Sequence, residues 1–332
     1  MRKTINPSAS KVKARRRSAR PTRHATPEMR LRRILVPLDF SGQSRQALDC
    51  AVPLAATFGA KISLLHVVQP PVVMRTMPDG GIAVPVNTDR LVELAGERLE
   101  EMAAGFLPAR VRGNRSVREG SPAYEIIAAA EALKADLIVL STHGFTGLKR
   151  VLLGSTAERV VRHAHCPVLT VHRRTDAPAQ VATSRRLPWR RMLVPLDFSK
   201  TSLRALDTAI PLAGKAGARL RLLHAVEPAP YAAGMEGVVL AMPEPTLVSA
   251  AKTNLKRVAR RFVPASIRVT SRVERGQAAS VIVQTAETEG TDLIVLSTHG
   301  HTGWNRLLLG STAEQVVRRA GCPVFVVRQP HG

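Results

Sequence analysis

Cysteines, long apolar runs and a signal sequence are scarce or missing, and each shortage excludes a class of protein. The three cysteines lie far apart without CxxC spacing, which argues against a disulfide framework or a cysteine zinc site and favours a reducing compartment. No apolar run reaches the roughly 18 residues needed to cross a bilayer, and the N-terminus lacks the apolar core of a secretory signal. We therefore expect a cytoplasmic protein with no membrane association. The Arg-rich, Ser-bearing, acid-poor N-terminus also fits an organelle transit peptide, and that alternative stays open.

Acidic and aromatic residues are also few. The chain has 49 Lys and Arg against 25 Asp and Glu, a formal charge of +24, and residues 1–33 alone hold twelve of these bases and one acid. Such a balance predicts non-specific attraction to polyanions and says nothing about the fold. Because only 3% of the residues are aromatic, little is available for base stacking. Any binding of nucleic acid by the tail should therefore depend on phosphate and on salt rather than on base sequence.

The sequence contains an internal duplication. The segment RRILVPLDFS at residues 32–41 recurs as RRMLVPLDFS at 190–199, and DLIVLSTHG begins at 136 and again at 292. From Asp136 to Val168, 26 of 33 positions are identical to their partners in the second copy. A chain of 332 residues suits about two domains of ordinary size. The predicted organisation is a basic tail at 1–30, a first domain at 31–172, an exposed linker at 173–189 and a second domain at 190–328.

Within each copy, short apolar or β-branched runs alternate with helical patterns. In the first copy the runs are ILVPL at 34–38, KISLLHVV at 61–68, a weak strand ending near Glu119, DLIVLS at 136–141 and PVLTV at 167–171. Five such strands alternating with four helices predict a parallel sheet covered on both faces, because every crossover returns the chain to the same end of the sheet. The predicted fold class is α/β, with two doubly wound five-stranded domains in tandem.

A glycine-rich stretch follows the fourth strand in both copies, STHGFTGLKRVLLGST at 141–156 and STHGHTGWNRLLLGST at 297–312. The carboxyl end of a strand is where ligands bind in α/β domains. Glycines there let backbone N–H groups approach a ligand, and a Ser-Thr pair at a helix start adds hydroxyl donors where the helix dipole favours an anion. The pattern indicates a phosphate site. The alternative is structural, since glycines also serve turns and Ser155 is a good N-cap.

These residues resemble the universal stress protein family, whose nucleotide-binding members carry G-x2-G-x9-G-[ST] after the fourth strand and an aspartate at the end of the first. The matching residues are Ser141, Gly144, Gly154 and Ser155 with Asp39 in the first copy, and Ser297, Gly300, Gly310 and Ser311 with Asp197 in the second. The resemblance covers residues 31–172 and 190–328. It implies an adenine nucleotide alpha hydrolase-like fold in each half, with strand order 3-2-1-4-5 and strands 1 and 4 adjacent at a topological switch point.

The resemblance also implies the ligand and the residues that hold it. The ligand would be ATP or AMP, with Mg²⁺ on the phosphates near Asp39 and Asp197 rather than a metal site made by the protein alone. Asp39 would contact the ribose or that metal, and Val67 would border the adenine. Gly144, Gly154, Ser155 and Thr156 would hold the phosphates, and the counterparts in the second copy are Asp197, Ala225, Gly300, Gly310, Ser311 and Thr312. The alternative for Asp39 is a strand-end cap that ties down the following loop.

Both copies depart from the family pattern at its first glycine, which is replaced by Ser141 and Ser297. If the position requires a positive φ, or if the ligand passes within contact distance, the added Cβ costs about 1–2 kcal/mol. If the hydroxyl instead donates to ribose or phosphate, it offsets that cost. The sequence leaves both interpretations open, and with them the occupancy of one or both sites.

The sequence favours binding over turnover. It has no GxxxxGK[ST] loop, no evident lysine for a γ-phosphate and no paired acids beside the motif, all of which serve phosphoryl transfer. The predicted function is a stress-response binding or regulatory protein, with weak ATP hydrolysis as a further option. The alternative is a scaffold that binds no nucleotide and associates with nucleic acid or ribosomes through its basic tail. Local hydrogen bonding is expected of His66, His143, His224 and His299, which lack ligand partners at suitable spacing.

The last strand of each copy, PVLTV at 167–171 and PVFVV at 323–327, would be an exposed sheet edge in an isolated domain. Exposed apolar edges need a partner. The resemblance to the family implies such a partner, because its single-domain members form dimers joined at this edge. We expect the two halves of this chain to pair with each other through these strands. Further pairing into homodimers stays open.

Overall fold

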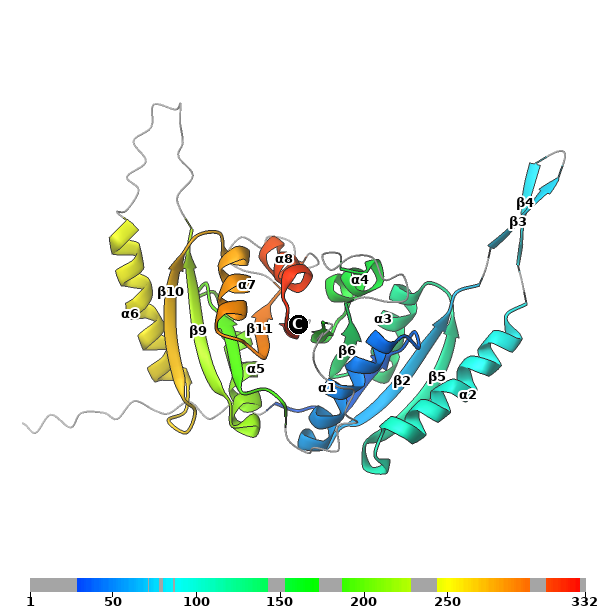
Figure 1. Cartoon of the computed structure of the whole chain (residues 1–332), viewed down its shortest axis with the longest axis horizontal. Helices are drawn as coiled ribbons and strands as arrows, with labels where there is room; N and C mark the ends of the chain where they lie inside the picture. The colour runs from blue at the N-terminus through cyan, green and yellow to red at the C-terminus, as the bar shows by residue number, and fades with distance from the viewer. Residues whose placement is uncertain are drawn as a thin grey trace, which may run out of the picture.

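One sheet of ten strands runs through both halves of the chain, with helices on both of its faces (Figure 1). The computed structural model describes residues 29–70, 72–77, 80–85, 87–142, 153–172, 187–227, 244–298 and 309–328. Most of the predicted tail and most of the predicted linker therefore lie outside the described residues. Within the described part of the chain, no helix is long and apolar enough to cross a membrane.

The first half contributes five strands to this sheet, namely β1 (Arg33–Pro37), β2 (Lys61–Val68), β5 (Arg112–Glu119), β6 (Leu137–Ser141) and β7 (Val168–Val171). Its helices are α1 (Gly42–Phe58), α2 (Asp89–Phe106), α3 (Pro122–Leu133) and α4 (Ser155–His163), with a 3-10 turn at Ala109–Val111. Between β2 and α2 the chain adds a separate antiparallel hairpin of β3 (Val72–Met77) and β4 (Gly80–Pro85). The strand and helix pattern of the sequence did not predict this hairpin.

The second half repeats the arrangement. Its strands are β8 (Arg191–Pro195), β9 (Arg219–Val226), β10 (Val269–Arg275), β11 (Leu293–Ser297) and β12 (Val324–Val327). Its helices are α5 (Lys200–Ala216), α6 (Glu244–Phe262), α7 (Ala278–Thr288) and α8 (Ser311–Arg319).

Each half has the strand order predicted from the resemblance. Hydrogen-bonded neighbours run β5-β2-β1-β6-β7 in the first half and β10-β9-β8-β11-β12 in the second, which is 3-2-1-4-5 in both. Every pairing within a half is parallel, and Ile34 of β1, for example, is in register with Ile62 of β2 on one side and Leu137 of β6 on the other. The α/β class and the doubly wound order are confirmed, so strands 1 and 4 are neighbours at a switch point in each half.

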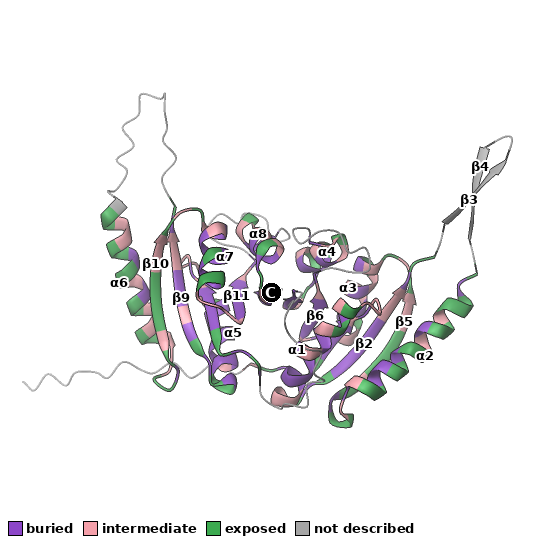
Figure 2. Ribbon diagram, in the orientation of Figure 1, coloured by how far each residue is buried: buried purple, intermediate pink, exposed green. Residues whose placement is uncertain are grey.

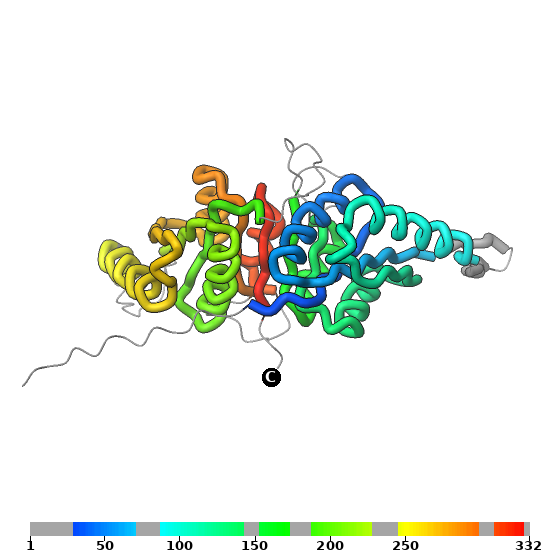
Figure 3. The backbone as a smooth tube through the Cα atoms, turned by 90° about the horizontal axis from the view of Figure 1, so that it is seen from below, coloured from blue at the N-terminus to red at the C-terminus, as the bar shows by residue number. Residues whose placement is uncertain are grey.

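The two halves pair with each other through β7 and β12, as expected. These strands are antiparallel, with Leu169 opposite Phe325 and Thr170 opposite Val324. Figure 3 shows the halves side by side, with the red C-terminal strand at the boundary. The outer strands of both halves nevertheless point upward in Figure 1. The reason is that the twist between neighbouring strands accumulates across the sheet and turns the outer strands of one half relative to those of the other.

Polar side chains join α4 and α8 across this boundary. Arg162 of α4 binds Glu158 on its own helix at 3.1 Å and Glu314 of α8 at 3.2 Å, and Arg318 of α8 binds Glu314 at 3.0 Å. The buried His172 donates from Nε2 to the carbonyl oxygen of Val317 at 2.7 Å. Arg328, the residue that follows β12 as His172 follows β7, donates to the carbonyl oxygen of Val161. The boundary therefore has a pseudo-twofold set of contacts.

Side chains of successive strand residues enter two buried clusters, one on each face of the sheet. Ile34 and Val36 belong to the cluster under α1, α2, α5 and α6, whereas Leu35 belongs to the cluster under α3, α4, α7 and α8. Both clusters contain residues of both halves, and Figure 2 shows the burial along the central strands. Leu187 and Trp189, at the end of the predicted linker, are 0% and 2% exposed and belong to the first of these clusters.

Candidate functional site

The turn after the first strand of each half is built around an aspartate. Asp39 Oδ1 accepts hydrogen bonds from the N–H of Ser41 at 3.0 Å and from its hydroxyl at 2.6 Å. Ser41 in turn is the N-cap of α1, where its oxygen accepts the N–H of Ser44 at 3.1 Å. Asp197 makes the corresponding bonds to Ser199 at 3.0 and 2.5 Å. One carboxylate oxygen of each aspartate therefore caps the strand end, as in the structural alternative for Asp39.

The residue inside this turn has a left-handed backbone. Phe40 has φ 62° and Phe198 has φ 64°, a conformation that costs a bulky residue about 1–2 kcal/mol. The Phe40 ring stacks on His66 with centroids 4.3 Å apart, and Phe198 packs on His224 at 4.6 Å. Each histidine also donates from Nδ1 to the carbonyl oxygen just before the aspartate, Leu38 or Leu196, at 2.7 Å. The local hydrogen bonding expected of these two histidines is present, and it holds the turn in its strained form. His143 and His299 lie outside the described residues.

A cavity of about 660 Å³ lies at the carboxyl ends of the central strands of the first half. It brings together five of the predicted site residues, Asp39, Val67, Ser141, Ser155 and Thr156. Gly154 is the N-cap of α4, immediately before two of them, and Gly144 lies outside the described residues. The other walls come from His66 and Phe40, from Pro122 and Ile126 of α3, and from Leu91, Leu94 and Arg98 of α2.

The second half has a matching cavity of about 340 Å³. Six predicted residues line it, Asp197, Ala225, Ser297, Gly310, Ser311 and Thr312, and Gly300 lies outside the described residues. Its other walls include His224, Glu227, Ala278 and Ile282. The duplicated residues that the sequence marked as a site therefore surround one cavity in each half.

The start of α4 lines the first cavity, and the start of α8 lines the second. The N–H of Gly154 donates a hydrogen bond to the carbonyl oxygen of Thr142 at 2.8 Å. In the second half, the N–H of Gly310 donates to the carbonyl oxygen of Thr298 at 2.7 Å. The N-cap residues of α4 and α8 are Gly154 and Gly310, which have no side chain that could cap these helices. The first-turn N–H groups of a helix have no partner within it, so Ser155 and Thr156 present backbone and hydroxyl donors to the cavity with the positive end of the helix dipole behind them.

The serines that replace the first glycine have ordinary backbones. Ser141 and Ser297 are the last residues of β6 and β11, and the only non-glycine residues with positive φ in the described part of the chain are Phe40, Lys134 and Phe198. The position therefore imposes no left-handed strain on serine. Both serines line their cavities and are half-buried, so their hydroxyls lie where a ligand can reach them.

Sequence reasoning missed part of this arrangement. The stacked Phe and His, the buried Thr142 and Thr298 that hold the helix starts, and the α2 wall of the first cavity were not predicted. For α2 a signal existed, because Leu91, Leu94 and Arg98 recur at helical spacing on one face. Among the described residues no group of three or more His, Cys, Asp or Glu is arranged to hold a metal ion.

The fold and these cavities define a class of protein. Each half is a doubly wound α/β domain with a cavity at its switch point, between the end of the first strand and a helix N-terminus, where anions are generally favoured. The sequence profile of the universal stress protein family matches residues 30–172 and 188–328, one match for each half. The chain belongs to this family, and it is a tandem member.

Relatives of both lengths share this similarity. A universal stress protein of Mycolicibacterium smegmatis is 30% identical over 306 residues, which cover 89% of this chain and 96% of that protein. Universal stress protein MJ0531 of Methanocaldococcus jannaschii is 37% identical over 147 residues, which cover 42% of this chain and 81% of that protein. The first relative spans both halves, and the second matches a single one.

Among solved structures, a universal stress protein from Archaeoglobus fulgidus superimposes with a TM-score of 0.62 at 24% identity, covering 90% of this chain and 96% of its own. At that identity the match shows a shared fold. A single-domain universal stress protein solved in complex with cAMP has a TM-score of 0.31 at 24% identity over 42% of this chain and 97% of its own. The complex describes the ligand of that protein.

Proposed function

We propose that each half of this chain binds an adenine nucleotide, ATP or AMP, and that the protein is a stress-response binding or regulatory protein. The observation that carries the proposal is that, in both halves, the described residues of the duplicated motif line one cavity together with the first-strand aspartate and the start of α4 or α8. A helix N-terminus with serine and threonine hydroxyls suits a phosphate group. The cavities, at about 340 and 660 Å³, have the size of small-molecule sites.

The proposed residue roles follow from these positions. Ser155, Thr156, Ser311 and Thr312 donate to phosphate oxygens, and Gly154 and Gly310 leave room for them. Val67 and Ala225, on the second strand, border the base. Asp39 and Asp197 each have one oxygen engaged by serine, and the other faces the ribose or a Mg²⁺ ion carried by the phosphates. Ser141 and Ser297 donate their hydroxyls to the same ligand.

The magnitudes favour binding over turnover. About three or four charge-assisted hydrogen bonds at about 1.5–3 kcal/mol each, less the cost of association, correspond to roughly micromolar affinity. Phosphoryl transfer also uses a residue that positions the nucleophile and cations that neutralise charge on the transferred group. Arg98 is the only Lys or Arg among the described residues that line either cavity.

The test is calorimetric titration of nucleotide-stripped protein with ATP, ADP and AMP in the presence of Mg²⁺. We expect saturable binding near two equivalents. Gly154→Asp and Gly310→Asp each place a carboxylate at a helix start, and the backbone there, with φ near −60°, accepts a side chain. Each variant should lose one equivalent, and the pair together should lose both.

A matched control is Gly321→Asp, at a position where an added Cβ meets nothing within 4 Å. It adds the same charge outside both cavities and should retain two equivalents. Affinity unchanged in the double Gly154→Asp, Gly310→Asp variant would refute the assignment of the helix starts. No binding by the unaltered protein at millimolar nucleotide would refute the function and leave the scaffold alternative.

A further inference from the structure

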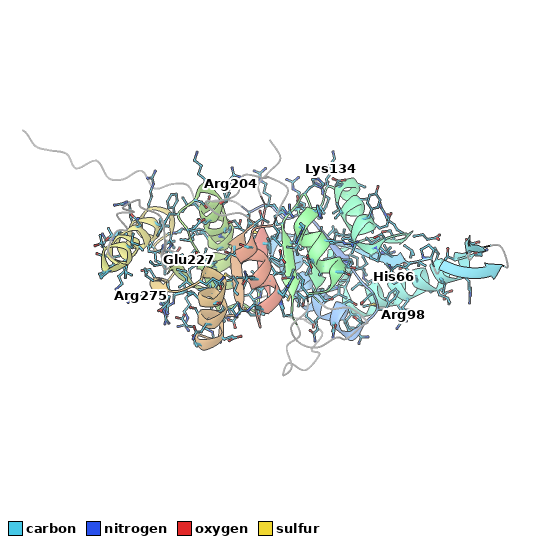
Figure 4. The ribbon with its side chains drawn as sticks, turned by 90° about the horizontal axis from the view of Figure 1, so that it is seen from above. His66, Arg98, Lys134, Arg204, Glu227 and Arg275 are labelled. Atoms are coloured by element: carbon cyan, nitrogen blue, oxygen red, sulfur yellow. The ribbon has the colours of Figure 1, made fainter. Side chains whose placement is uncertain are left out.

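The two cavities differ in the charged residues that face them. Arg98 of α2 lines the first cavity together with Asp39. The second is lined by two carboxylates, Asp197 and Glu227, and by no Lys or Arg among the residues the structure describes. Figure 4 shows Arg98 beside His66 in the first half and Glu227 in the second. The halves share their fold and motif, so the charged residues that line the cavities are a main difference between them.

Glu227 follows the last residue of β9 and is anchored at a helix start. Its Oε1 accepts the N–H of Ala278, the first residue of α7, at 2.9 Å. An anion at this point gains from the helix dipole, so the carboxylate takes a place that a ligand phosphate would also favour. In the first half the equivalent residues are Gln69, which is neutral, and Pro122, which has no N–H to offer.

Arg98 is held at the mouth of the first cavity. Its guanidinium carbon lies 4.9 Å from the centre of the Phe40 ring, a cation–π contact that orients the group without consuming its donors. When the C-terminal ends of α2 and α6 are aligned, Phe106 on Phe262, the counterpart of Arg98 is Asn254. No residue of α6 is among the described residues that line the second cavity.

Two further charges lie near these strand ends outside the cavity walls. Glu119, the last residue of β5, accepts a hydrogen bond from the Thr88 hydroxyl. Its counterpart Arg275, the last residue of β10, is in register with Val226, next to Glu227. Arg275 is exposed to solvent, as Glu227 is, so water screens the attraction between them. The carboxylates of Glu227 and Asp197 remain the charged groups among the described residues that line the second cavity.

We propose that the two nucleotide sites are specialised by ligand charge: the first half selects the triphosphate through Arg98, and the second selects the monophosphate because Glu227 repels added phosphates. This inference rests on the proposed nucleotide binding and names Arg98 and Glu227 as specificity-determining residues. A unit charge about 8 Å from a phosphate, in an effective dielectric constant of about 40, changes affinity about fivefold per phosphate charge.

The experiment measures each site alone. Gly310→Asp protein reports the first site and Gly154→Asp protein the second, each titrated with ATP and with AMP in EDTA, where the two ligands differ by about two negative charges. The ratio of the AMP to the ATP dissociation constant should be at least about fivefold higher at the first site than at the second.

Single substitutions then assign the effect to the two residues. In the Gly154→Asp background, Glu227→Gln should strengthen ATP binding at least about fivefold and AMP binding less, because the amide oxygen still accepts the Ala278 N–H while the charge is gone. Arg98→Gln in the Gly310→Asp background should weaken ATP binding by about the same factor. The matched control is Glu287→Gln, the same substitution at the other, exposed end of α7. It should leave the ratio of the AMP to the ATP dissociation constant unaltered at each site.

The outcomes separate the two proposals. The charge specialisation would be overturned if the ratio of the AMP to the ATP dissociation constant were equal at the two sites, or if Glu227→Gln changed this ratio no more than Glu287→Gln does. Either result would leave nucleotide binding itself intact. Absence of binding in both backgrounds and in the unaltered chain would overturn nucleotide binding itself. Addition of Mg²⁺ should narrow the difference between the sites, because the ion neutralises two charges of ATP.

Discussion

Phe325→Ala tests whether the two halves share one core. Phe325 is 0% exposed and lies opposite Leu169 in the antiparallel pair that joins the halves. It belongs to the buried cluster that includes α1 residues of the first half and α5 residues of the second. Truncation of a buried phenylalanine to alanine costs about 3–5 kcal/mol through lost transfer energy and the cavity left behind. That is a large fraction of the about 5–15 kcal/mol that stabilises an ordinary domain.

The assay is equilibrium unfolding in urea followed by far-UV circular dichroism, with calorimetry to count transitions. We expect the unaltered protein to unfold in one transition, and Phe325→Ala to lower the free energy of unfolding by about 4 kcal/mol. Phe106→Ala is the control, because Phe106 is half-buried at the end of α2, away from the boundary, and should cost less. Two separate transitions in the unaltered protein, with only one of them moved by Phe325→Ala, would refute a core shared between the halves.

Three further outcomes test local features. Ser41→Ala removes both the N-cap of α1 and the donor to Asp39, and it should lower the free energy of unfolding by about 1–2 kcal/mol in urea titrations; no change would refute the capping role. Gly113→Ala should lower the free energy of unfolding, because the added Cβ would lie 2.8 Å from the carbonyl oxygen of Ile62. Gly105→Ala, in open space within α2, should raise the free energy of unfolding by up to about 1 kcal/mol. Equal effects of the two substitutions in urea titrations would contradict the close approach of Gly113 to Ile62. Burial raises the pKa of the Cys166 thiol to about 12 from an ordinary value of 9.0, so at pH 8 the thiolate fraction of Cys166 is roughly a thousandfold lower than that of an ordinary cysteine. Iodoacetamide should therefore alkylate Cys166 far more slowly in native than in unfolded protein, as measured by peptide mass spectrometry. Equal alkylation rates in the two states would contradict the raised pKa.

The strand order and the location of the site were within reach of the sequence, because duplicated motifs and apolar runs report buried strands and the ends that follow them. Ile34 and Leu137 are in runs without polar alternation, as strands buried on both faces must be. The hairpin at Val72–Met77 and Gly80–Pro85 was missed because it lies outside the parallel sheet, where the alternation of strand and helix gives no information. Its four prolines, two before the first strand, one between the strands and one at the end of the second, also argue against strands.

The left-handed backbone at Phe40 was beyond local propensity, since a bulky residue disfavours that conformation. It is maintained by contacts with His66, a residue that lies on another strand. The sequence itself shows that Gln69 of the first half is replaced by Glu227 in the second. The consequence of this replacement depends on the start of α7, which lies within hydrogen-bonding distance of Glu227. Contacts between distant segments decide both features, and a sequence pattern does not report such contacts.

The antiparallel seam between β7 and β12 has an evolutionary consequence. In a homodimer any substitution appears in both subunits at once, so the two pockets must remain identical. When the same seam joins two halves of one chain, their pairing no longer depends on protein concentration, since the linker keeps the effective concentration of the partner high. Each pocket is then encoded separately and is free to drift. The differences at Arg98 and Glu227 are of the kind that only such a fused pair can accumulate.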